Sequence, residues 1–277
     1  METILLPTDF SEAAKNALHY AMGFARQTGI RKIILFNAYQ PSPVSDPVLN
    51  SIDFYEIEAF KKISEENLEK LKAEINLAGE QPFSVECIGE FNSVLGGIRS
   101  VIDRMPIDLI ILGLSQPGGM DELLGGNNGL HIAKQSPIPV IAVPLHAGFV
   151  PIQKILLACD LKEVIETTPV SNIKALLDKT GAKLFLFHET HADKRSTPGM
   201  PFEGLMLNTL FQAYQPEFTF SENADFGSAV NEIAAENGID LVINIPKKYG
   251  ILSELFRHSH TRNLLLHAKL PVMLVHN

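Results

Sequence analysis

The sequence predicts an α/β protein built from two tandem Rossmann-like halves, each an open five-stranded parallel sheet with helices on both faces. Short apolar runs alternate with segments of helical periodicity, which is the pattern of a parallel sheet covered on both sides. The run Ile-Leu-Leu-Ala-Cys-Asp at 155–160 repeats Ile-Leu-Leu-Pro-Thr-Asp at 4–9, an offset of 151 (155 − 4). A chain of 277 residues is also long enough for two domains.

Five apolar runs predict the strands of the first half, and the segments between them have helical spacing. The strand runs are 4–6, 33–36, 83–88, 109–112 and 140–143. The expected helices are 11–28, 48–78, 92–104 and 127–136. Charged residues fill the polar side of the second helix, which indicates a solvated face.

The second half repeats this order in a shorter form. Its strand runs are 155–160, 184–187, 218–220, 241–243 and 272–275. Asp240 repeats Asp108 at an offset of 132 (240 − 108), so 19 residues (151 − 132) have been lost, and the long second helix is the expected place. We expect domains at 1–146 and 151–277.

Composition excludes several classes of protein. The net charge is -9, from 32 acidic and 23 basic residues, and no basic run could follow a phosphate backbone, so nucleic acid is not an expected partner. No secretory signal or membrane-spanning stretch is seen, so we expect a cytoplasmic protein without a membrane partner. Cys87 and Cys159 are far apart in sequence and indicate neither a disulfide framework nor a thiolate metal site.

Two segments of the first half carry a family resemblance. The opening Ile4-Leu5-Leu6-Pro7-Thr8-Asp9-Phe10-Ser11 and the closing stretch from Leu123 to Val143 resemble those of universal stress protein domains. The likeness covers nearly the whole chain, twice. It implies strand order 3-2-1-4-5 in each half, and an intrachain pseudo-dimer that pairs its last strands at 139–143 and 270–275. A homodimer of the whole chain is a further expectation.

The resemblance also implies a nucleotide site, because ATP-binding members carry a loop G-x2-G-x9-G-[S/T] after the fourth strand. Glycines let the backbone approach phosphate, and a helix N-terminus presents free N–H groups. Gly113 and Gly126 match the first and third glycines, but Gln116 and Asn127 replace the second glycine and the Ser/Thr. The cofactor implied is ATP with Mg²⁺, and the residues implied to bind it are Pro7, Thr8, Asp9, Ala38, Leu112, Gly113, Ser115, Gln116, Gly126, Asn127 and Asn128.

Each part of this site has a structural alternative. The glycines and asparagines from 125 to 129 could form only a helix-initiating turn. Asp9 and Glu12 have the spacing of a capping box, which Asp160 and Glu163 repeat in the second half.

In the second half the loop has lost its glycines. Ile245, Lys248 and His258 with Ser259 take their places, so this site is expected to be degenerate. His188, His191, His258 and His260 could converge on a metal, but a surface or capping role is the simpler interpretation, and no metal site is predicted.

The resemblance therefore implies a stress-response regulatory module that binds ATP or another adenine nucleotide in its first half. No catalytic motif is found, so no catalytic residue is predicted. Two alternatives remain open. One is a nucleotide-free scaffold for protein interaction in which both sites are degenerate, and the other is an enzyme that hydrolyses ATP slowly.

Overall fold

The structure of the chain is a computed structural model. The residues that it describes are 1–40, 54–115, 127–159, 164–188, 200–221, 223, 225–246 and 260–276.

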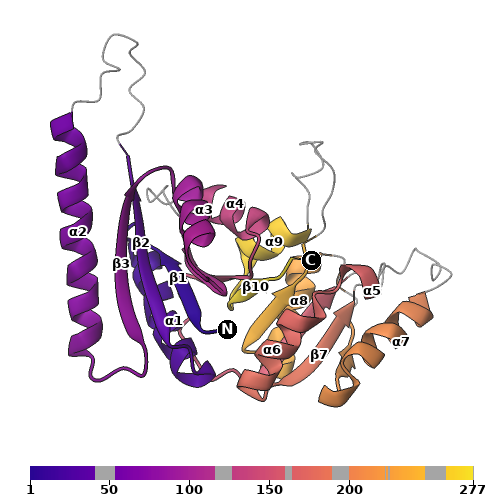
Figure 1. Cartoon of the computed structure of the whole chain (residues 1–277). Coiled ribbons are helices and arrows are strands. Elements are labelled where there is room, and N and C mark those ends of the chain that lie inside the picture. The colour runs from indigo at the N-terminus through magenta and orange to yellow at the C-terminus, as the bar shows by residue number, and fades with distance from the viewer. Residues whose placement is uncertain are drawn as a thin grey trace, which may run out of the picture.

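The first half alternates strands and helices in the predicted order (Figure 1). Its elements are β1 (Thr3–Pro7), α1 (Glu12–Thr28), β2 (Lys32–Tyr39), α2 (Phe54–Leu77), β3 (Ser84–Phe91), α3 (Val94–Arg104), β4 (Leu109–Leu114), α4 (Asn127–Gln135) and β5 (Val140–Pro144). The part of the expected second helix before residue 54 lies outside the described residues.

The second half repeats this order with two changes. Its elements are β6 (Lys154–Cys159), α5 (Val164–Thr167), α6 (Val170–Thr180), β7 (Lys183–His188), α7 (Met200–Leu210), a 3-10 turn (Gln212–Tyr214), β8 (Glu217–Thr219), α8 (Phe226–Asn237), β9 (Leu241–Asn244), α9 (His260–His267) and β10 (Val272–Leu274). Pro169 divides the first helix of this half into α5 and α6, because proline cannot donate the N–H that a continuous helix needs. The predicted shortening lies in α7, which has 11 residues where α2 has 24.

All ten strands form one sheet in the order β3-β2-β1-β4-β5-β10-β9-β6-β7-β8. Read from its outer edge, each half has the order 3-2-1-4-5, as predicted. Strands within a half are parallel, and the halves join where β5 pairs antiparallel with β10, with Met273 opposite Ile141. The predicted pairing through the last strands is therefore found.

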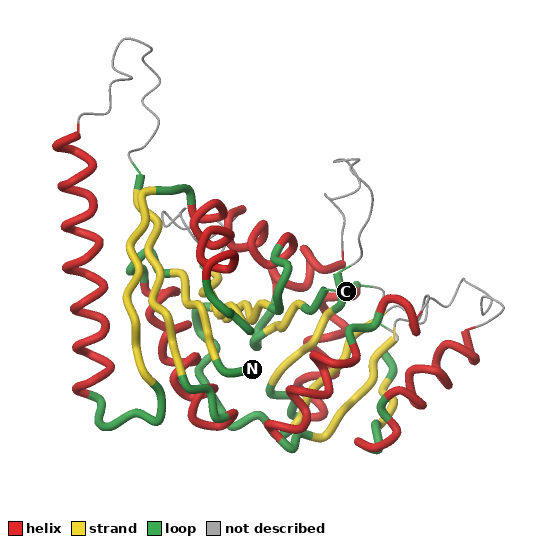
Figure 2. Tube along the Cα trace, in the orientation of Figure 1, coloured by secondary structure: helices red, strands yellow, loops and turns green. Residues whose placement is uncertain are grey.

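Helices lie on both faces of the sheet (Figure 2), and the apolar cores beneath them contain residues of both halves. Side chains alternate along the central strands, so Leu109 and Ile111 face one core while Ile110 and Leu112 face the other. Both cores contain residues of the two halves, which makes the join part of the hydrophobic core.

Asp108 and Asp240, which recur at an offset of 132, have the same structural role in the two halves. Asp108 Oδ2 accepts the N–H groups of Glu2 and Thr3 at 2.7 and 3.0 Å. Asp240 Oδ2 accepts those of Gln153 and Lys154 at 2.8 and 2.9 Å. Each carboxylate thereby ties the start of the first strand of its half to the strand beside it.

One face of α1 holds the segment that links the halves. The Asn16 amide donates to the carbonyls of Pro144 and Ala147, and Gln27 exchanges two hydrogen bonds with the backbone of Ile152. Between them the ring of Phe149 lies against Gly23, where a β-carbon would overlap it. The linker is therefore fixed to α1 at both ends.

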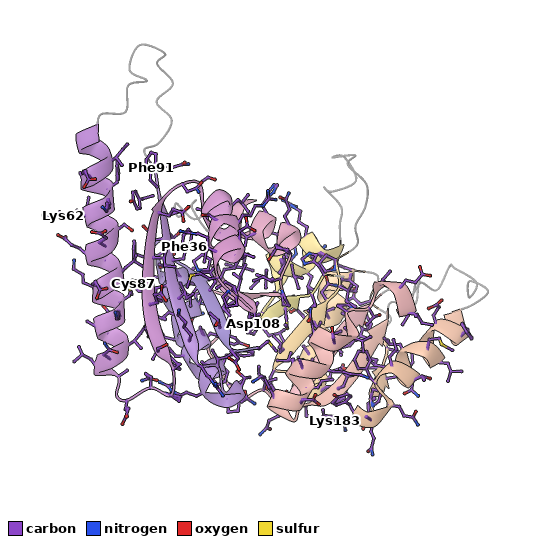
Figure 3. The ribbon with its side chains drawn as sticks, viewed as in Figure 1. Phe36, Lys62, Cys87, Phe91, Asp108 and Lys183 are labelled. Atoms are coloured by element: carbon purple, nitrogen blue, oxygen red, sulfur yellow. The ribbon has the colours of Figure 1, made fainter. Side chains whose placement is uncertain are left out.

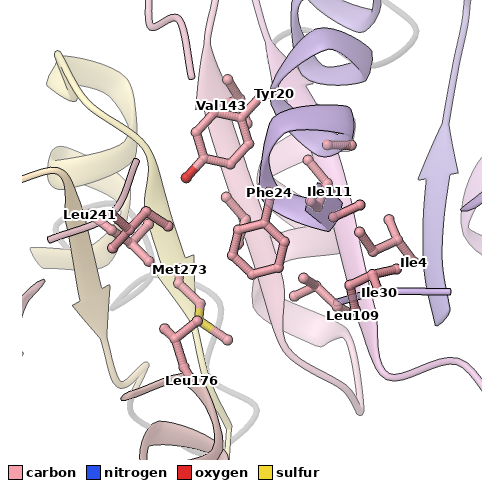
Figure 4. Packing of buried hydrophobic residues seen from close by; sticks show 14 of the residues in the cluster. Ile4, Tyr20, Phe24, Ile30, Leu109, Ile111, Val143, Leu176, Leu241 and Met273 are labelled. Carbon is pink, nitrogen blue, oxygen red and sulfur yellow. The ribbon is translucent and has the colours of Figure 1, made fainter. Parts of the chain in front are cut away.

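Tyr20 lies in this join, with its ring edge-on to Phe149 and its hydroxyl pointing toward the second half (Figure 4). The side chain is 1% exposed, and its hydroxyl finds no hydrogen-bond partner in the described part of the chain. Burial raises the pKa of this phenol, and the charge of Asp240 raises it further.

Replacing Tyr20 with phenylalanine is expected to raise the free energy of unfolding by about 1 kcal/mol, because a buried hydroxyl without a partner costs free energy. Urea unfolding followed by circular dichroism measures the change. Tyr214→Phe is the control, since it removes a hydroxyl that donates to Asp178 at 2.6 Å. Destabilisation by Tyr20→Phe would show that the hydroxyl has a stabilising partner.

Candidate functional site

The carboxyl end of β1 passes into α1 through a turn that side chains hold in place. The Phe10 N–H donates to Thr8 Oγ1 at 3.0 Å, and the Ser11 N–H donates to Asp9 Oδ1 at 3.1 Å. Phe10 has a φ of 65°, an unfavourable value for a bulky residue. The turn keeps Asp9 half-buried at the end of the strand, where α/β sheets bind their ligands.

The predicted capping box of Asp9 and Glu12 is wrong. Ser11 caps α1, because its hydroxyl accepts the Ala14 N–H at 3.3 Å, while Glu12 pairs with Lys15. The left-handed backbone at Phe10 directs the Asp9 carboxylate to the N–H of Ser11 instead of into the first helical turn. The corresponding segment at Asp160 lies outside the described residues.

A shallow depression opens beside this turn, at the ends of β1 and β2 and the start of α3. It contains four of the predicted site residues, together with three that sequence reasoning missed. The lining residues are Pro7, Thr8, Asp9, Phe36, Asn37, Ala38 and Val94. Asp9 is the one charged residue among them, and the structure brings it together with Ala38 at the ends of β1 and β2.

The floor of the depression is fixed by a buried polar network. The Asn37 amide donates to the Thr8 carbonyl, and the Ser64 hydroxyl donates to Asn37 Oδ1, both at 2.7 Å. These bonds tie β1, β2 and α2 together, so the Asn37 amide supports the site while Asp9 faces it. Asn37 directly follows an apolar strand run, which is the sequence signal that could have identified it.

Two predicted site residues of β4, Leu112 and Gly113, lie below the depression, inside the protein. Leu112 is fully buried in the core and does not line the depression. Gly113 lies within β4 beneath α1, where an added β-carbon would overlap the carbonyl group of Ala13. Close packing of α1 on the sheet therefore accounts for this glycine without any ligand.

The structure describes less of the remaining loop. Ser115 follows β4 and is half-buried. Asn127 and Asn128 begin α4, in agreement with a helix start at this point, and their side chains are not described. Gln116 and Gly126 lie outside the described residues.

In the second half the position of Gly113 is occupied by Ile245, whose side chain packs against the core. β9 ends at Asn244, and the helix that corresponds to α1 is divided at Pro169. The close approach of helix to strand is thus not repeated there. Lys248, His191, His258 and Ser259 lie outside the described residues, as do the side chains of His188 and His260.

Cys87 lies on β3 beneath α2 and is half-buried (Figure 3). Burial raises the pKa of its thiol to about 11, and the charge of Glu69 adds to this. The thiol is therefore protonated at neutral pH and a weak nucleophile. The side chain of Cys159 is outside the described set.

The described residues also bear on metal binding and on membrane insertion. No group of three or more His, Cys, Asp or Glu side chains comes together there in a way that could hold a metal ion. Within the same residues, no helix combines the length and apolar character required to cross a membrane.

Two doubly wound parallel halves joined in one sheet, with a depression at the strand ends of the first half, define the class of Rossmann-like α/β proteins. The model of the universal stress protein family matches the chain twice, over residues 1–144 and 151–276. The chain belongs to this family.

Solved structures agree with this assignment at the level of the fold. A universal stress protein from Archaeoglobus fulgidus DSM 4304 is 18% identical with a TM-score of 0.71, and the match covers 99% of this chain and 98% of that one. A functionally unknown protein from Pseudomonas aeruginosa PAO1 is 14% identical with a TM-score of 0.61, and the match covers 99% and 92%. No curated protein matches the chain.

Proposed function

We propose that the first half binds an adenine nucleotide, ATP with Mg²⁺, at the ends of β1 and β2, and that the chain acts in the cytoplasm as a regulatory module of the stress response. The observation that supports this most directly is the depression at the strand ends, which contains Pro7, Thr8, Asp9 and Ala38. Family membership supports the stress-response role.

The described residues fit the adenosine part of such a ligand. Pro7 and Ala38 offer small apolar surfaces against which a base can lie. One oxygen of Asp9 accepts the Ser11 N–H, and the other finds no hydrogen-bond partner in the described part of the chain, so it can accept a ribose hydroxyl. The phosphates would depend on backbone N–H groups at the start of α4 and on Mg²⁺, which supplies positive charge when bound.

Calorimetric titration with ATP and Mg²⁺ tests the proposal. Ala38→Phe fills the depression, and Asp9→Asn removes the charge while keeping an oxygen for the Ser11 N–H. Each is expected to weaken binding at least about tenfold, because the phenyl ring occupies the space of the base and the Asn amide lacks the second acceptor oxygen. Asp160→Asn, at the repeated position in the second half, is the control and should bind like the wild type.

One observation favours a nucleotide-free scaffold instead. Gly113, the first glycine of the expected loop, is explained by helix packing. Absence of heat at millimolar ATP, together with no nucleotide released from the denatured protein, would establish the scaffold and exclude the binding proposal. Phosphate release that Ala38→Phe abolishes would instead identify a slow hydrolase.

A further inference from the structure

An apolar groove runs between α3 and α4 in the first half, which lie side by side above the sheet (Figure 1). Its floor consists of Leu95, Ile98, Ile102 and Ile132, of which Ile98 and Ile132 are buried. Arg99, Gln135, Ser136 and Pro137 complete its lining. The groove thus combines an apolar floor with a cation at its edge.

In the second half the corresponding helices, α8 and α9, pack against each other where the first half has the groove. Residues of α8 and α9 correspond to those of α3 and α4 at an offset of 132, so Gly227 stands where Leu95 stands in the first half (227 − 95). A β-carbon at Gly227 would overlap the side chain of Asn263, so α9 lies directly against α8. In the first half this position carries Leu95, whose side chain lines the groove between α3 and α4.

Hydrogen bonds that involve side chains also hold α8 against α9. Asn263 Nδ2 donates to Asp225 Oδ1 at 2.9 Å, and Asn231 Nδ2 donates to the His267 carbonyl at 3.0 Å. Asn231 Oδ1 also accepts the Lys269 N–H at 3.4 Å.

The first half lacks the means to form these hydrogen bonds. Arg99 replaces Asn231 and has no acceptor atom, and Pro137 replaces Lys269 and has no N–H. The two halves therefore differ here, because α8 and α9 are in direct contact while α3 and α4 leave a groove between them.

The chemistry of the groove indicates its occupant. Arg99 is exposed, and no carboxylate of the described residues lies within 4.0 Å of its guanidinium group. The floor therefore suits a few apolar side chains, and the exposed guanidinium group at its edge suits one acidic group.

We propose that this groove binds a partner protein through an amphipathic helix, whose apolar side chains occupy the floor while an acidic residue pairs with Arg99. An amphipathic helix commonly binds by laying its apolar face into a hydrophobic groove. The proposal does not depend on nucleotide binding. The groove and the depression share only the helix α3, whose first residue, Val94, lines the depression.

A model peptide tests this inference on the full chain without nucleotide. The probe is a fluorescein-labelled peptide of about 16 residues, long enough for some helix, with leucines at i, i+4 and i+7 and one glutamate on that face. Fluorescence anisotropy measures its binding. Arg99→Glu is expected to weaken binding about tenfold and to favour a second peptide in which lysine replaces that glutamate.

Leu95→Asp should abolish binding, because it puts a charge in the floor of the groove while the carboxylate stays compatible with the first turn of α3. Arg31→Glu and Leu205→Asp are matched controls, since both residues are exposed and lie outside the groove. They should bind the peptide like the wild type.

Three results would overturn the proposal. The first is absence of peptide binding, and the second is binding that Arg99→Glu leaves unchanged. The third is a different occupant. That would be shown if decanoate perturbs the groove in nuclear magnetic resonance spectra and the peptide does not, or if sedimentation detects self-association of the chain that Arg99→Glu abolishes.

Discussion

Replacing Gly113 with alanine is expected to lower the free energy of unfolding by about 3 kcal/mol, even without any nucleotide. The added β-carbon would overlap the carbonyl group of Ala13 and approach the Ala14 nitrogen to 3.0 Å. These are backbone atoms of α1, so no side-chain rotation relieves the overlap. The helix must move away from β4, and contacts of its small face, Ala13, Ala14, Ala17, Ala21 and Ala25, would be lost.

Urea unfolding followed by circular dichroism measures this effect. Gly148→Ala is the matched control, because a β-carbon there meets no atom within 4 Å. An unchanged midpoint for Gly113→Ala would show that α1 can shift at no cost. If that stable variant had also lost ATP binding, the glycine would serve the nucleotide.

The fold could be predicted because its signals are local and repeated. The apolar runs of the strands recur at fixed offsets, and a run of residues such as 109–112, buried on both faces, is what a central parallel strand requires. Asp108 and Asp240 also recur for a physical reason, since each binds two backbone N–H groups of the neighbouring strand.

The candidate site could be predicted only in part, because its supports come from distant segments. Pro7, Thr8 and Asp9 follow a recognisable strand, and the structure places them at the depression. The bond between Ser64 and Asn37 joins residues 27 positions apart, and no periodicity signals it. The packing role of Gly113 likewise depends on how closely α1 approaches the sheet.

The cap of α1 shows a different limit. The spacing of Asp9 and Glu12 fits a capping box, but that pattern assumes an ordinary backbone after the cap. Phe10 adopts a left-handed conformation that bulky residues rarely take, so the cap moves to Ser11. Packing of Phe10 against the core offsets the cost of that conformation, and a sequence pattern does not reveal such packing.

The tandem organisation has an energetic consequence that the repeat alone does not imply. The halves share one sheet, and α1 fixes the linker through Asn16, Gly23 and Gln27. The Lys179 ammonium of α6 also donates to the Thr28 carbonyl at the end of α1 at 2.7 Å. We therefore expect the halves to unfold together, in one transition.

Replacing Met273 with aspartate is expected to lower the free energy of unfolding by more than about 4 kcal/mol and to abolish the single unfolding transition. Met273 is fully buried in the middle of β10, opposite Ile141 of β5, where the cores of the two halves meet (Figure 4). A carboxylate there would lose its hydration, and β5 and β10 pair at only three positions. Losing this contact should separate the second half from the first.

Thermal unfolding followed by circular dichroism, together with limited proteolysis, distinguishes the outcomes. In the Met273→Asp protein, cleavage should concentrate in residues 151–276 while the first half stays resistant. Val150→Asp introduces the same charge at a linker position that is 51% exposed, and it should behave like the wild type. A single transition within about 1 kcal/mol of the wild type would mean that the join tolerates a charge, and that the linker and α1 hold the halves together without the strand pair.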